Sequence, residues 1–493
     1  MEKLLSLLEN IEYTLVGNKG LLSENVTSLS YNSADVCKGA AFFCLAGARA
    51  DGHDFAHEAY KNGARVFFCE HALALPRGTL QIIVENSRLA LARTSAAFFR
   101  HPEKKLALIA VTGTKGKSTV CEMISHIFTH AGKMCATVGT LGIKIGAKRE
   151  PTENSTPESF IIYKALAEAA AQGAEYAVLE VSSQALCTHR VEGLRFAAAV
   201  FTNLSRDHIG AHEHPSFEHY KSAKKSLFSK SDFALICADD AFAEEFAQAC
   251  ACPFSTYGTA EAADIRALGV RPKQSGFGVS FLYSEGKMQA RVNLSLPGDF
   301  SALNALAAIA VCRRFGVPLT RASKALESAE IRGRLEYVPC ARRDITCIID
   351  YAHNGISLEK ALATLRAYAR GRIICLFGSV GGRTRERRRG LAEAAARGAE
   401  ICIVTSDNPD FEDPSAIIEE IASYIPREKC FCIADRAAAI SAALNMAESG
   451  DFLLFAGKGH EEYQLVCGKK LPFSERELIK NHIFKNYGLI PSP

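Results

Sequence analysis

The stretch VTGTKGKSTV, residues 111–120, has the residue types of a nucleotide-binding loop. Such a loop usually reads G-x-x-x-x-G-K-[ST]: its backbone N–H groups cradle phosphate, its lysine reaches the terminal phosphates and its hydroxyl residue binds Mg²⁺. Here only two residues separate Gly113 from Gly116, and Lys117 and Ser118 follow directly. The sequence therefore predicts a short ATP-binding loop, with a glycine- and lysine-rich surface turn as the alternative.

Two further residues are candidate ligands for the magnesium that accompanies ATP. Mg²⁺ prefers hard ligands and keeps several of its waters. Glu180, in LEVSSQ, ends a strand-like run and is the natural carboxylate, and His208, in FTNLSRDHIG, is the next candidate. A single histidine in such a position is often structural, and this alternative stays open.

The elements that must position these residues alternate in type along the chain. Short apolar runs rich in β-branched residues alternate with helical patterns, which favours parallel sheets built of βαβ units. The runs are LALIAV (106–111), YAVLEV (176–181), AAAVFTN (197–203) and FALICA (233–238), followed after residue 344 by ITCIID, RIICLFG, EICIVTSD and DFLLFAG.

Polar residues recur at the point where these runs end. Open parallel sheets bind ligands beyond the carboxyl ends of their strands, so such positions predict functional sites rather than structural turns alone. The polar groups are Gly113–Ser118, Glu180, Asp350, Asp407-Asn408-Pro409 and Gly457-Lys458-Gly459-His460.

A chain of 493 residues is long enough for about three domains. A polar break lies at 98–105, and EIRGRLEYV marks a second boundary. We therefore expect an α/β protein of three domains, spanning residues 1–102, 103–332 and 333–493. The central domain would carry the ATP-binding loop on a parallel sheet, and the last would be Rossmann-like.

Composition excludes several functional classes. The net charge of +4 gives no support to nucleic-acid binding, and no apolar run reaches the roughly 20 residues that span a bilayer. The 17 cysteines lie scattered in apolar stretches, where cysteine behaves as a small buried hydrophobic residue. We expect reduced thiols in a cytoplasmic protein.

Together these motifs resemble the Mur ligase family, the ATP-dependent amide-bond synthetases of peptidoglycan assembly, over nearly the whole chain. TGTKGKST resembles the family's shortened loop, LEVSSQ and TNLSRDHIG its metal motifs, and HYKSAKKSLF the segment with a carbamylated lysine. LNALAAIA, GRLE and DYAHN resemble its adenine, arginine and nucleotide-facing motifs. The resemblance implies ATP contacts from Gly113, Thr114, Lys115, Gly116, Lys117, Ser118, Thr119, Asn304, Arg334 and Asp350. It implies metal ligation by Ser118, Glu180, His208 and carbamylated Lys224, with Lys117, Lys224, Glu180 and His208 as the catalytic residues.

The resemblance also implies a substrate. The segment 31–55 is similar to the family's uridine-nucleotide domain, although Asn32 and Ala34 stand where Asp and Arg are usual. A UDP-MurNAc-dipeptide would contact Ser33, Ser155, Thr156, Ser182 and Arg190.

The implied reaction joins a diamino acid to the D-Glu of UDP-MurNAc-L-Ala-D-Glu, in peptidoglycan precursor synthesis. ATP would phosphorylate the carboxylate to an acyl phosphate, which the amine attacks. ATP and Mg²⁺ are the implied cofactors, the other partners are small molecules, and we expect a monomer. Closure of the last domain, with Arg334 where a hinge is expected, would shield the acyl phosphate from water.

The loop TSDNPDFEDP matches the family's amino-acid selection motif, in which the diaminopimelate-adding branch has arginine after D-N-P. Asp410 stands there instead, and its charge favours a side-chain ammonium, as in lysine or ornithine, unless Asp410 points away from the pocket. Lysine and ornithine differ by one methylene and are not separated here. The resemblance places Asp407, Asn408, Pro409, Asp410, Gly457 and Glu461 at the amino acid.

An arginine cluster, GGRTRERRRG (381–390), has two interpretations: a solvated helix start, or a site for a carboxylate. The family's carboxylate-binding arginine aligns with Thr384, so Arg383 or Arg385 would replace it, and Arg383 is our choice.

The same reaction with meso-diaminopimelate as the added amino acid is an alternative to lysine or ornithine, and three competing functions also remain. Two are ligases of the same superfamily, a tripeptide-extending ligase and a folylpolyglutamate synthetase; the uridine-type first domain and the GKGHE sequence argue against both. The third is a non-catalytic nucleotide-binding protein with a degenerate site, against which the intact Lys117, Glu180, His208 and Asn304 argue.

Overall fold

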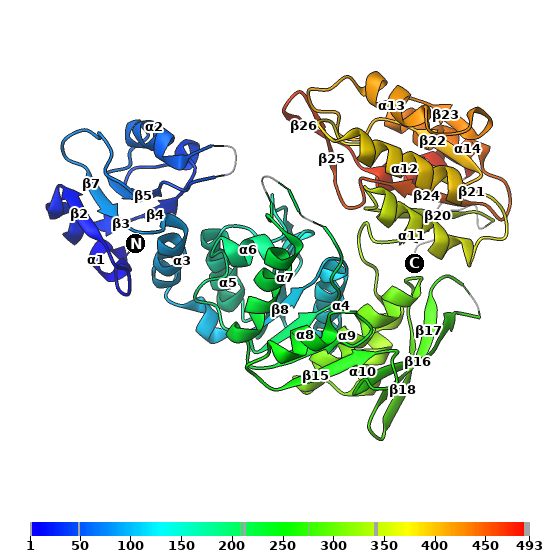
Figure 1. The fold of residues 1–493 in the computed structure, drawn as a ribbon, viewed down its shortest axis with the longest axis horizontal. Helices are drawn as coiled ribbons and strands as arrows, with labels where there is room; N and C mark the ends of the chain where they lie inside the picture. Colours follow the sequence, from blue (N-terminus) through cyan, green and yellow to red (C-terminus); the bar gives the residue numbers. More distant parts are fainter. Residues whose placement is uncertain are drawn as a thin grey trace. The chain divides into compact units, whose positions relative to one another are not determined.

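Figure 1 shows the computed structural model of the chain, which describes residues 2–487 except 48–49, 208, 211–212, 275 and 340–343, with the backbone alone at 485–487. The described residues form two compact units. The first comprises Met1–Ala267, Tyr283–Gln289 and Leu303–Ala322, and the second comprises Leu268–Leu282, Ala290–Ala302 and Ser323–Pro493. Among the described helices, none is both long and apolar enough to cross a bilayer.

The first unit begins with a five-stranded sheet in the order β2-β7-β6-β5-β4. All pairs are parallel except β2 with β7, and the apolar side chains of the central strands are buried on both faces. A two-stranded pair, β1 with β3, lies outside this sheet. The bounds are β1 (Glu2–Lys3), α1 (Leu4–Leu7), β2 (Thr14–Gly17), β3 (Asn25–Val26), β4 (Ser28–Ser30), β5 (Ala40–Phe43), α2 (Ala56–Lys61), β6 (Val66–Cys69), β7 (Leu80–Ile83) and α3 (Ser87–Phe98).

An eleven-stranded sheet follows, in the order β11-β10-β9-β12-β8-β13-β14-β15-β16-β17-β18. The strands from β9 to β16 in this order pair in parallel, so their carboxyl ends share one edge. The strands are β8 (Ala107–Thr112), β9 (Cys135–Gly139), β10 (Gly142–Ile145), β11 (Lys148–Glu150), β12 (Tyr176–Glu180), β13 (Ala198–Phe201), β14 (Ala234–Cys237), β15 (Phe254–Gly258), β16 (Ile265–Pro272), β17 (Val279–Glu285) and β18 (Met288–Asn293).

Helices between these strands pack against the sheet and complete its apolar core. Strand β8 is central because five of its six residues are buried between parallel neighbours, and the loop after it therefore lies at the middle of the sheet edge. The helices are α4 (Lys117–His130), α5 (Ser159–Ala171), α6 (Ser183–Cys187), α7 (Phe217–Lys225), α8 (Ala243–Gln248), α9 (Asp299–Arg314) and α10 (Leu319–Ala325).

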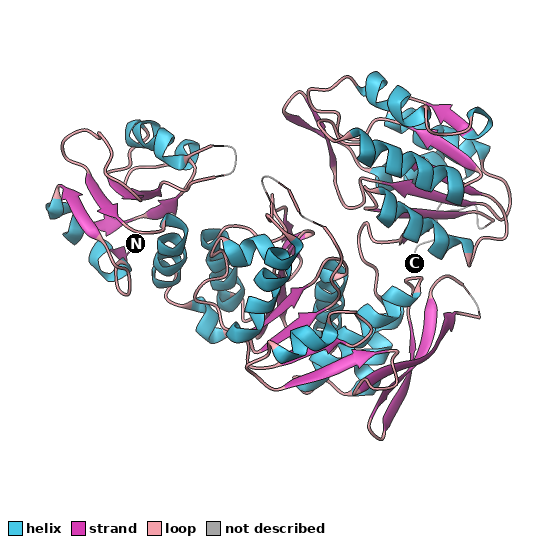
Figure 2. Ribbon diagram, in the orientation of Figure 1, coloured by secondary structure: helices cyan, strands magenta, loops and turns pink. Residues whose placement is uncertain are grey.

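The last sheet, in the second unit, has six strands in the order β19-β20-β24-β21-β22-β23. Only β19 is antiparallel, and helices cover both faces (Figure 2), giving one apolar core on each side of the sheet. The bounds are β19 (Glu336–Val338), β20 (Thr346–Asp350), α11 (Gly355–Arg366), β21 (Ile373–Phe377), α12 (Arg385–Gly398), β22 (Ile401–Val404), α13 (Pro414–Ala422), β23 (Cys430–Cys432), α14 (Arg436–Met446), β24 (Phe452–Ala456), β25 (Tyr463–Val466), β26 (Lys469–Pro472) and α15 (Glu475–Tyr487).

The predicted α/β fold with largely parallel sheets is confirmed. Each apolar run named above forms one strand: LALIAV lies in β8, YAVLEV in β12 and DFLLFAG in β24. The boundaries at 102 and 332 stay a prediction, because the compact units divide the chain elsewhere.

Candidate active site

The nucleotide loop lies between β8 and α4, as the sequence predicts. Gly113 has φ +147° and Gly116 has φ +88°, a region that disfavours other residues. A Cβ at Gly113 would lie 2.0 Å from the Thr202 hydroxyl oxygen, and one at Gly116 would lie 2.6 Å from Asn304 Oδ1. Gly113 therefore allows the loop to pack against the segment after β13, and Gly116 allows it to pack against α9, which brings Asn304 to the loop from far along the chain.

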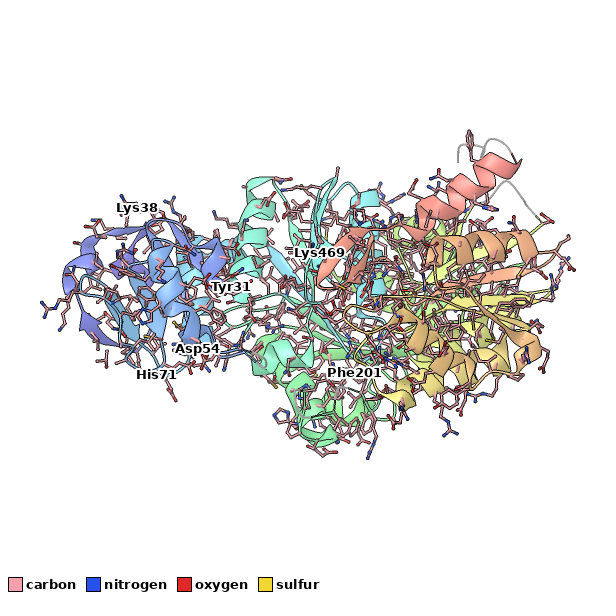
Figure 3. The ribbon with its side chains drawn as sticks, turned by 90° about the horizontal axis from the view of Figure 1, so that it is seen from above. Tyr31, Lys38, Asp54, His71, Phe201 and Lys469 are labelled. Atoms are coloured by element: carbon pink, nitrogen blue, oxygen red, sulfur yellow. The ribbon has the colours of Figure 1, made fainter. Side chains whose placement is uncertain are left out.

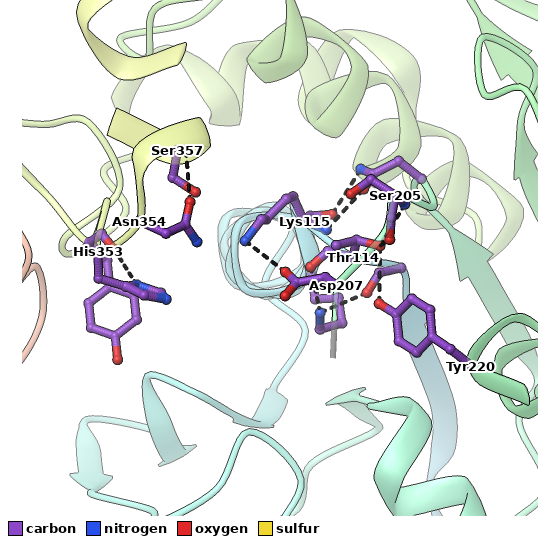
Figure 4. Close-up of polar contacts among 12 residues, drawn as sticks. Thr114, Lys115, Ser205, Asp207, Tyr220, His353, Asn354 and Ser357 are labelled. Carbon is purple, nitrogen blue, oxygen red and sulfur yellow. Dashed lines mark hydrogen bonds and ion pairs between the residues drawn. The ribbon is translucent and has the colours of Figure 1, made fainter. Parts of the chain in front are cut away.

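The segment after β13 fixes the shape of this loop. The Thr114 N–H donates to the Asn203 carbonyl (2.8 Å), and the Lys115 N–H donates to Asn203 Oδ1 (2.9 Å). The Thr202 hydroxyl donates to the Lys115 carbonyl (2.7 Å). Figure 4 shows Thr114 against the Tyr220 hydroxyl (3.1 Å) and Lys115 beside Asp207 (3.4 Å). Thr202, Asn203 and Tyr220 were not among the predicted site residues, although the TN of TNLSRDHIG pointed to the first two.

Two lysine amines meet at the carbonyl of Gly113. Lys117 Nζ donates to it at 2.8 Å and Lys224 Nζ at 3.0 Å. Lys224 is only 2% exposed, and burial, together with the charge of Lys117, lowers the pKa of Lys224 well below its usual value, while Asp207 acts the other way. A buried lysine with a lowered pKa has the free amine that carbamylation by carbon dioxide requires.

Glu180, at the end of β12, is buried, and both of its carboxylate oxygens accept hydrogen bonds from Thr140. The Thr140 N–H donates to Oε1 (2.7 Å), and the Thr140 hydroxyl donates to Oε2 (3.1 Å). Ser118, in the first turn of α4, is also buried. A hydroxyl and a carboxylate are hard oxygen donors, so this pair fits Mg²⁺. His208 lies outside the described residues.

The residues predicted for the glycopeptide lie beside Glu180. The Thr156 hydroxyl donates to the Glu180 carbonyl (2.8 Å) and accepts the Ser182 N–H (3.0 Å). The Arg190 guanidinium donates to the Thr156 carbonyl (3.0 Å). Ser155 precedes this cluster and is half-buried. Three of the five residues predicted for this substrate, Thr156, Ser182 and Arg190, are thus joined by hydrogen bonds to one another or to the backbone of Glu180.

A cavity of about 580 Å³ in the first unit contains Ser33 in its wall, and the role of Ser33 in uridine-nucleotide binding stays a prediction. Tyr31, labelled in Figure 3, also lines it, and the Ser33 hydroxyl donates to Glu58 (2.8 Å). Arg88 and Glu158 line the cavity as well; Glu158 pairs with Arg88 and, at 3.1 Å, with Arg190. Glu158 thereby connects the cavity to the glycopeptide cluster, a role that the sequence analysis missed.

In the second unit, the ends of β22 and β24 bring one buried polar cluster together. Lys458 is fully buried, and its amine donates to Asn408 Oδ1 (2.8 Å) and Glu461 Oε2 (2.9 Å) and lies 3.5 Å from Asp407 Oδ1. Asn408 Nδ2 donates to the same Glu461 oxygen (2.9 Å). Lys458, which the sequence left between a site role and a structural turn, is therefore the charge that holds three predicted residues in place; Pro409 and Gly457 flank them.

Asp410 has a left-handed backbone, with φ +53°. Its Oδ1 accepts the Gly468 N–H (2.8 Å), and its own N–H donates to the Leu465 carbonyl (3.0 Å), so the residue braces the β25–β26 hairpin. Asp tolerates this backbone conformation better than most residues do. Its side chain has a structural contact that the sequence did not predict.

The arginine cluster is divided between structural and exposed side chains. Arg388 is buried and pairs with Glu412 and Glu420, which ties α12 to α13. Thr384 caps α12, its hydroxyl accepting the Arg387 N–H (3.4 Å). Arg383 is exposed in the segment before the helix and stays our candidate for a carboxylate ligand.

Asp350 ends β20 and accepts the N–H groups of Leu335 (2.7 Å) and Ala352 (2.8 Å). Burial raises the pKa of Asp350, and the Arg334 charge opposes this rise. The Arg334 guanidinium lies over the Tyr351 ring, 4.8 Å from its centre. The predicted partners Arg334 and Asp350 therefore share one site, next to the capped start of α11, where Asn354 Oδ1 accepts the Ser357 N–H (2.9 Å; Figure 4).

Comparison with known proteins supports these assignments at the level of the family. The Mur ligase family catalytic domain matches residues 25–110, the Mur ligase middle domain matches 111–312, and the Mur ligase glutamate ligase domain matches 333–459.

Relatives match over almost the full length. UDP-N-acetylmuramoyl-L-alanyl-D-glutamate–2,6-diaminopimelate ligase of Syntrophomonas wolfei is 37% identical, with 97% of this chain and 98% of the relative covered. The ligase of the same name from Caldanaerobacter subterraneus is 35% identical, with the same coverage. A solved structure of a ligase of that name is 28% identical and covers 99% of this chain and 100% of its own, with a TM-score of 0.68. A MurF ligase from Thermotoga maritima, solved with ADP, is 18% identical with a TM-score of 0.60, covers 94% of this chain and 97% of its own, and shows the fold alone.

The loop, the buried carboxylate and these matches agree: the chain belongs to the Mur ligase family and is an ATP-dependent ligase.

Proposed function

We propose that this ligase adds a diamino acid to the D-Glu carboxylate of UDP-MurNAc-L-Ala-D-Glu, through an acyl phosphate. The observation that carries the proposal is the hydrogen bond from the Thr156 hydroxyl to the Glu180 carbonyl, with the Ser182 N–H and the Arg190 guanidinium both bonded to Thr156. It supports the proposal because polar groups suited to a glycopeptide carboxylate lie beside the carboxylate that we assign to the metal. The names of the relatives support the same substrate.

In the first unit, Lys117 and the N–H groups of residues 113–118 would bind the phosphates of ATP, with Asn304 at the adenine. Ser118, Glu180, His208 and a carbamate on Lys224 would hold Mg²⁺, which supplies positive charge for the phosphoryl group as it moves. Arg190 would orient the acceptor carboxylate. Ser33 and Ser155 would contribute to binding the UDP-MurNAc part.

In the second unit, the cluster around Lys458 would position the incoming amino acid, with Asp407, Asn408 and Glu461 presenting acceptors to its ammonium groups. Arg383 would bind its α-carboxylate. Arg334 and Asp350 would contact the nucleotide. The substrates are charged small molecules that do not cross a bilayer unaided, so we place the reaction in the cytoplasm, and we propose that the chain acts as a monomer.

Asp410 supports L-lysine or L-ornithine as the amino acid. A carboxylate at this position repels the second carboxylate of diaminopimelate and attracts a side-chain ammonium, whatever its contact with Gly468 does for the hairpin. The second candidate is meso-diaminopimelate, which the names of the relatives support.

The experiment is phosphate release from ATP with UDP-MurNAc-L-Ala-D-Glu, run separately with lysine, ornithine and meso-diaminopimelate. Release with one of the three supports the ligase reaction, and release with none contradicts it. Release with diaminopimelate alone contradicts our use of Asp410. We expect Asp410→Arg to lower kcat/KM for lysine or ornithine about tenfold or more and to improve diaminopimelate use. Asp410→Asn, which keeps the left-handed backbone accessible, is the control for the loss of the contact with Gly468.

A further inference from the structure

A second group of metal-ligating side chains lies apart from the oxygen ligands described above. The Cys187 sulfur and one ring nitrogen each of His214 and His219 lie within 4.8 Å of one another. Cys187 ends α6, His219 lies in the first turn of α7, and His214 lies in the segment before α7. We propose that these three side chains bind a borderline or soft divalent cation of the zinc class, joining α6 to α7.

The ligand types determine the class of metal. Thiolate and imidazole favour Zn²⁺ and similar transition-metal ions, whereas Mg²⁺ requires oxygen ligands. The proposed site is therefore chemically distinct from the Mg²⁺ ligands of the ATP reaction. It also stands or falls independently of the proposed function.

The Nδ1 atoms of the two histidines already lie close to each other. His214 Nδ1 lies 2.8 Å from His219 Nδ1, and His214 Nε2 lies 2.8 Å from the Ser183 hydroxyl oxygen. With Nε2–H donating to this hydroxyl, the Nδ1 lone pair of His214 points toward His219. Such an outer hydrogen bond fixes the tautomer of histidines that bind metals.

The spacing suits a four-coordinate ion after small side-chain movements. In a tetrahedral zinc site the ligand atoms are separated by about 3.3 to 3.6 Å, as follows from Zn–N and Zn–S bonds of about 2.0 and 2.3 Å. The imidazole pair at 2.8 Å needs to open slightly, and the sulfur, which lies within 4.8 Å of the ring nitrogens, needs to approach them by no more than about 1.3 Å.

Burial differs among the three ligands in a way that leaves access for the ion. His214 is 1% exposed, whereas Cys187 and His219 reach the surface. Three protein ligands and an open side correspond to a site that water completes.

The site has a consequence for the residues around it. Helix α6 follows directly on Ser182, and α7 carries Lys224. A bound ion therefore fixes the segment assigned to the glycopeptide against the helix with the buried lysine.

The test uses the full chain, freed of metal with EDTA, and Co²⁺ as a spectroscopic probe, without nucleotide. We expect the near-ultraviolet band of thiolate-to-cobalt charge transfer, with stoichiometric loss of the band when Zn²⁺ is added. Cys187→Ser removes the band. The matched control Cys432→Ser, at another exposed cysteine, keeps it.

A second measurement covers the histidines. His219→Gln, at an exposed position, weakens Co²⁺ binding about tenfold or more, and Zn²⁺ raises the melting temperature of the wild type but not of Cys187→Ser. Absence of the charge-transfer band in the wild type, or its persistence in Cys187→Ser, overturns the proposal.

Discussion

At the scale of single residues, Thr140 is the side chain whose position says most about the metal site that we propose at Glu180. It donates to both oxygens of Glu180, through its N–H and its hydroxyl, so it fixes the orientation of the carboxylate as well as its position. Groups that orient a metal ligand in this way commonly affect metal affinity about 10–100-fold.

We therefore predict that Thr140→Val raises the Mg²⁺ concentration for half-maximal phosphate release by about tenfold or more. Thr140→Ser keeps the hydroxyl and therefore its hydrogen bond, which contributes roughly 0.5–1.5 kcal/mol. The Mg²⁺ concentration for half-maximal phosphate release of this variant should stay within about threefold of the wild-type value. The measurement is a Mg²⁺ titration of phosphate release at saturating ATP. Equal Mg²⁺ curves for Thr140→Val and the wild type would show that the hydroxyl does not orient Glu180.

At the scale of elements, the junction of β8 and α4 contains a glycine, Gly116, at which a side chain would be strained and would clash with a neighbour. A Cβ at Gly116 meets Asn304 Oδ1 at 2.6 Å, and the backbone has φ +88°. Gly132, after the last turn of the same helix, also has a positive φ of +76°, but its Cβ would meet no atom within 4 Å in the described structure. A comparison of the two glycines therefore separates the energetic cost of a positive φ from the cost of a steric clash with a neighbouring side chain.

We expect Gly132→Ala to cost about 1–2 kcal/mol of stability and to leave nucleotide binding unchanged. Gly116→Ala should cost at least as much and also weaken binding of a non-hydrolysable ATP analogue about tenfold or more, because the loop or Asn304 must move. Calorimetric titration with the analogue and thermal unfolding measure the two effects. Similar analogue affinities for both variants would contradict the assigned role of the loop.

A second element-scale prediction concerns the start of β21 and β24. Asp451 accepts the N–H groups of Arg372 and Glu448 and pairs with the Arg372 guanidinium (2.7 Å). The Arg372 side chain and these N–H groups lower the pKa of Asp451 against the opposing effect of burial. A carboxyl whose pKa is lower when folded stabilises the fold above its unfolded pKa of about 3.9, and this stabilisation is lost as the pH falls through the folded value.

Asp451→Asn should accordingly lower the free energy of unfolding by about 1–3 kcal/mol at pH 7, and the difference from the wild type should shrink below about pH 4. Denaturant unfolding followed by circular dichroism at several pH values is the measurement. Glu419→Gln, at an exposed position of α13, serves as the control and should change little. A difference that does not vary with pH would exclude the ion pair as its cause.

At the scale of the whole molecule, the separate apolar cores of the two units predict that each unit unfolds in its own thermal transition. In the second unit, Arg436 is almost fully buried and pairs with the buried Glu475 (2.8 Å). The same guanidinium donates to the carbonyls of Ser406 (3.2 Å) and Ala456 (2.8 Å), which directly precede Asp407 and Gly457. One arginine thus ties together the two segments that form the polar cluster around Lys458.

Removing one partner of a buried ion pair costs about 3–5 kcal/mol, because the other charge stays buried. We predict that Arg436→Met lowers the melting temperature of the second unit, whereas an ATP analogue still raises the melting temperature of the first unit. The double variant Arg436→Met/Glu475→Leu should recover part of the loss. Differential scanning calorimetry with and without the analogue tests this. An equal fall in every transition would mean that the chain unfolds as one cooperative body.

The sequence by itself determined the order of the elements and the chemistry at the strand ends. Runs such as LALIAV form buried strands because short stretches of apolar and β-branched residues are covered on both faces of a parallel sheet, and the polar residues that follow them therefore collect at one edge. The tertiary structure alone decided which distant groups meet: Asn203 with Lys115, Thr140 with Glu180, and Lys458 with Asn408 at the centre of its cluster. It also showed that the Asp410 carboxylate braces a hairpin, a contact that no charge argument contains. The reason is physical: local sequence sets the period and the turns, whereas hydrogen bonds between segments tens of residues apart depend on how the strands are ordered in the sheet.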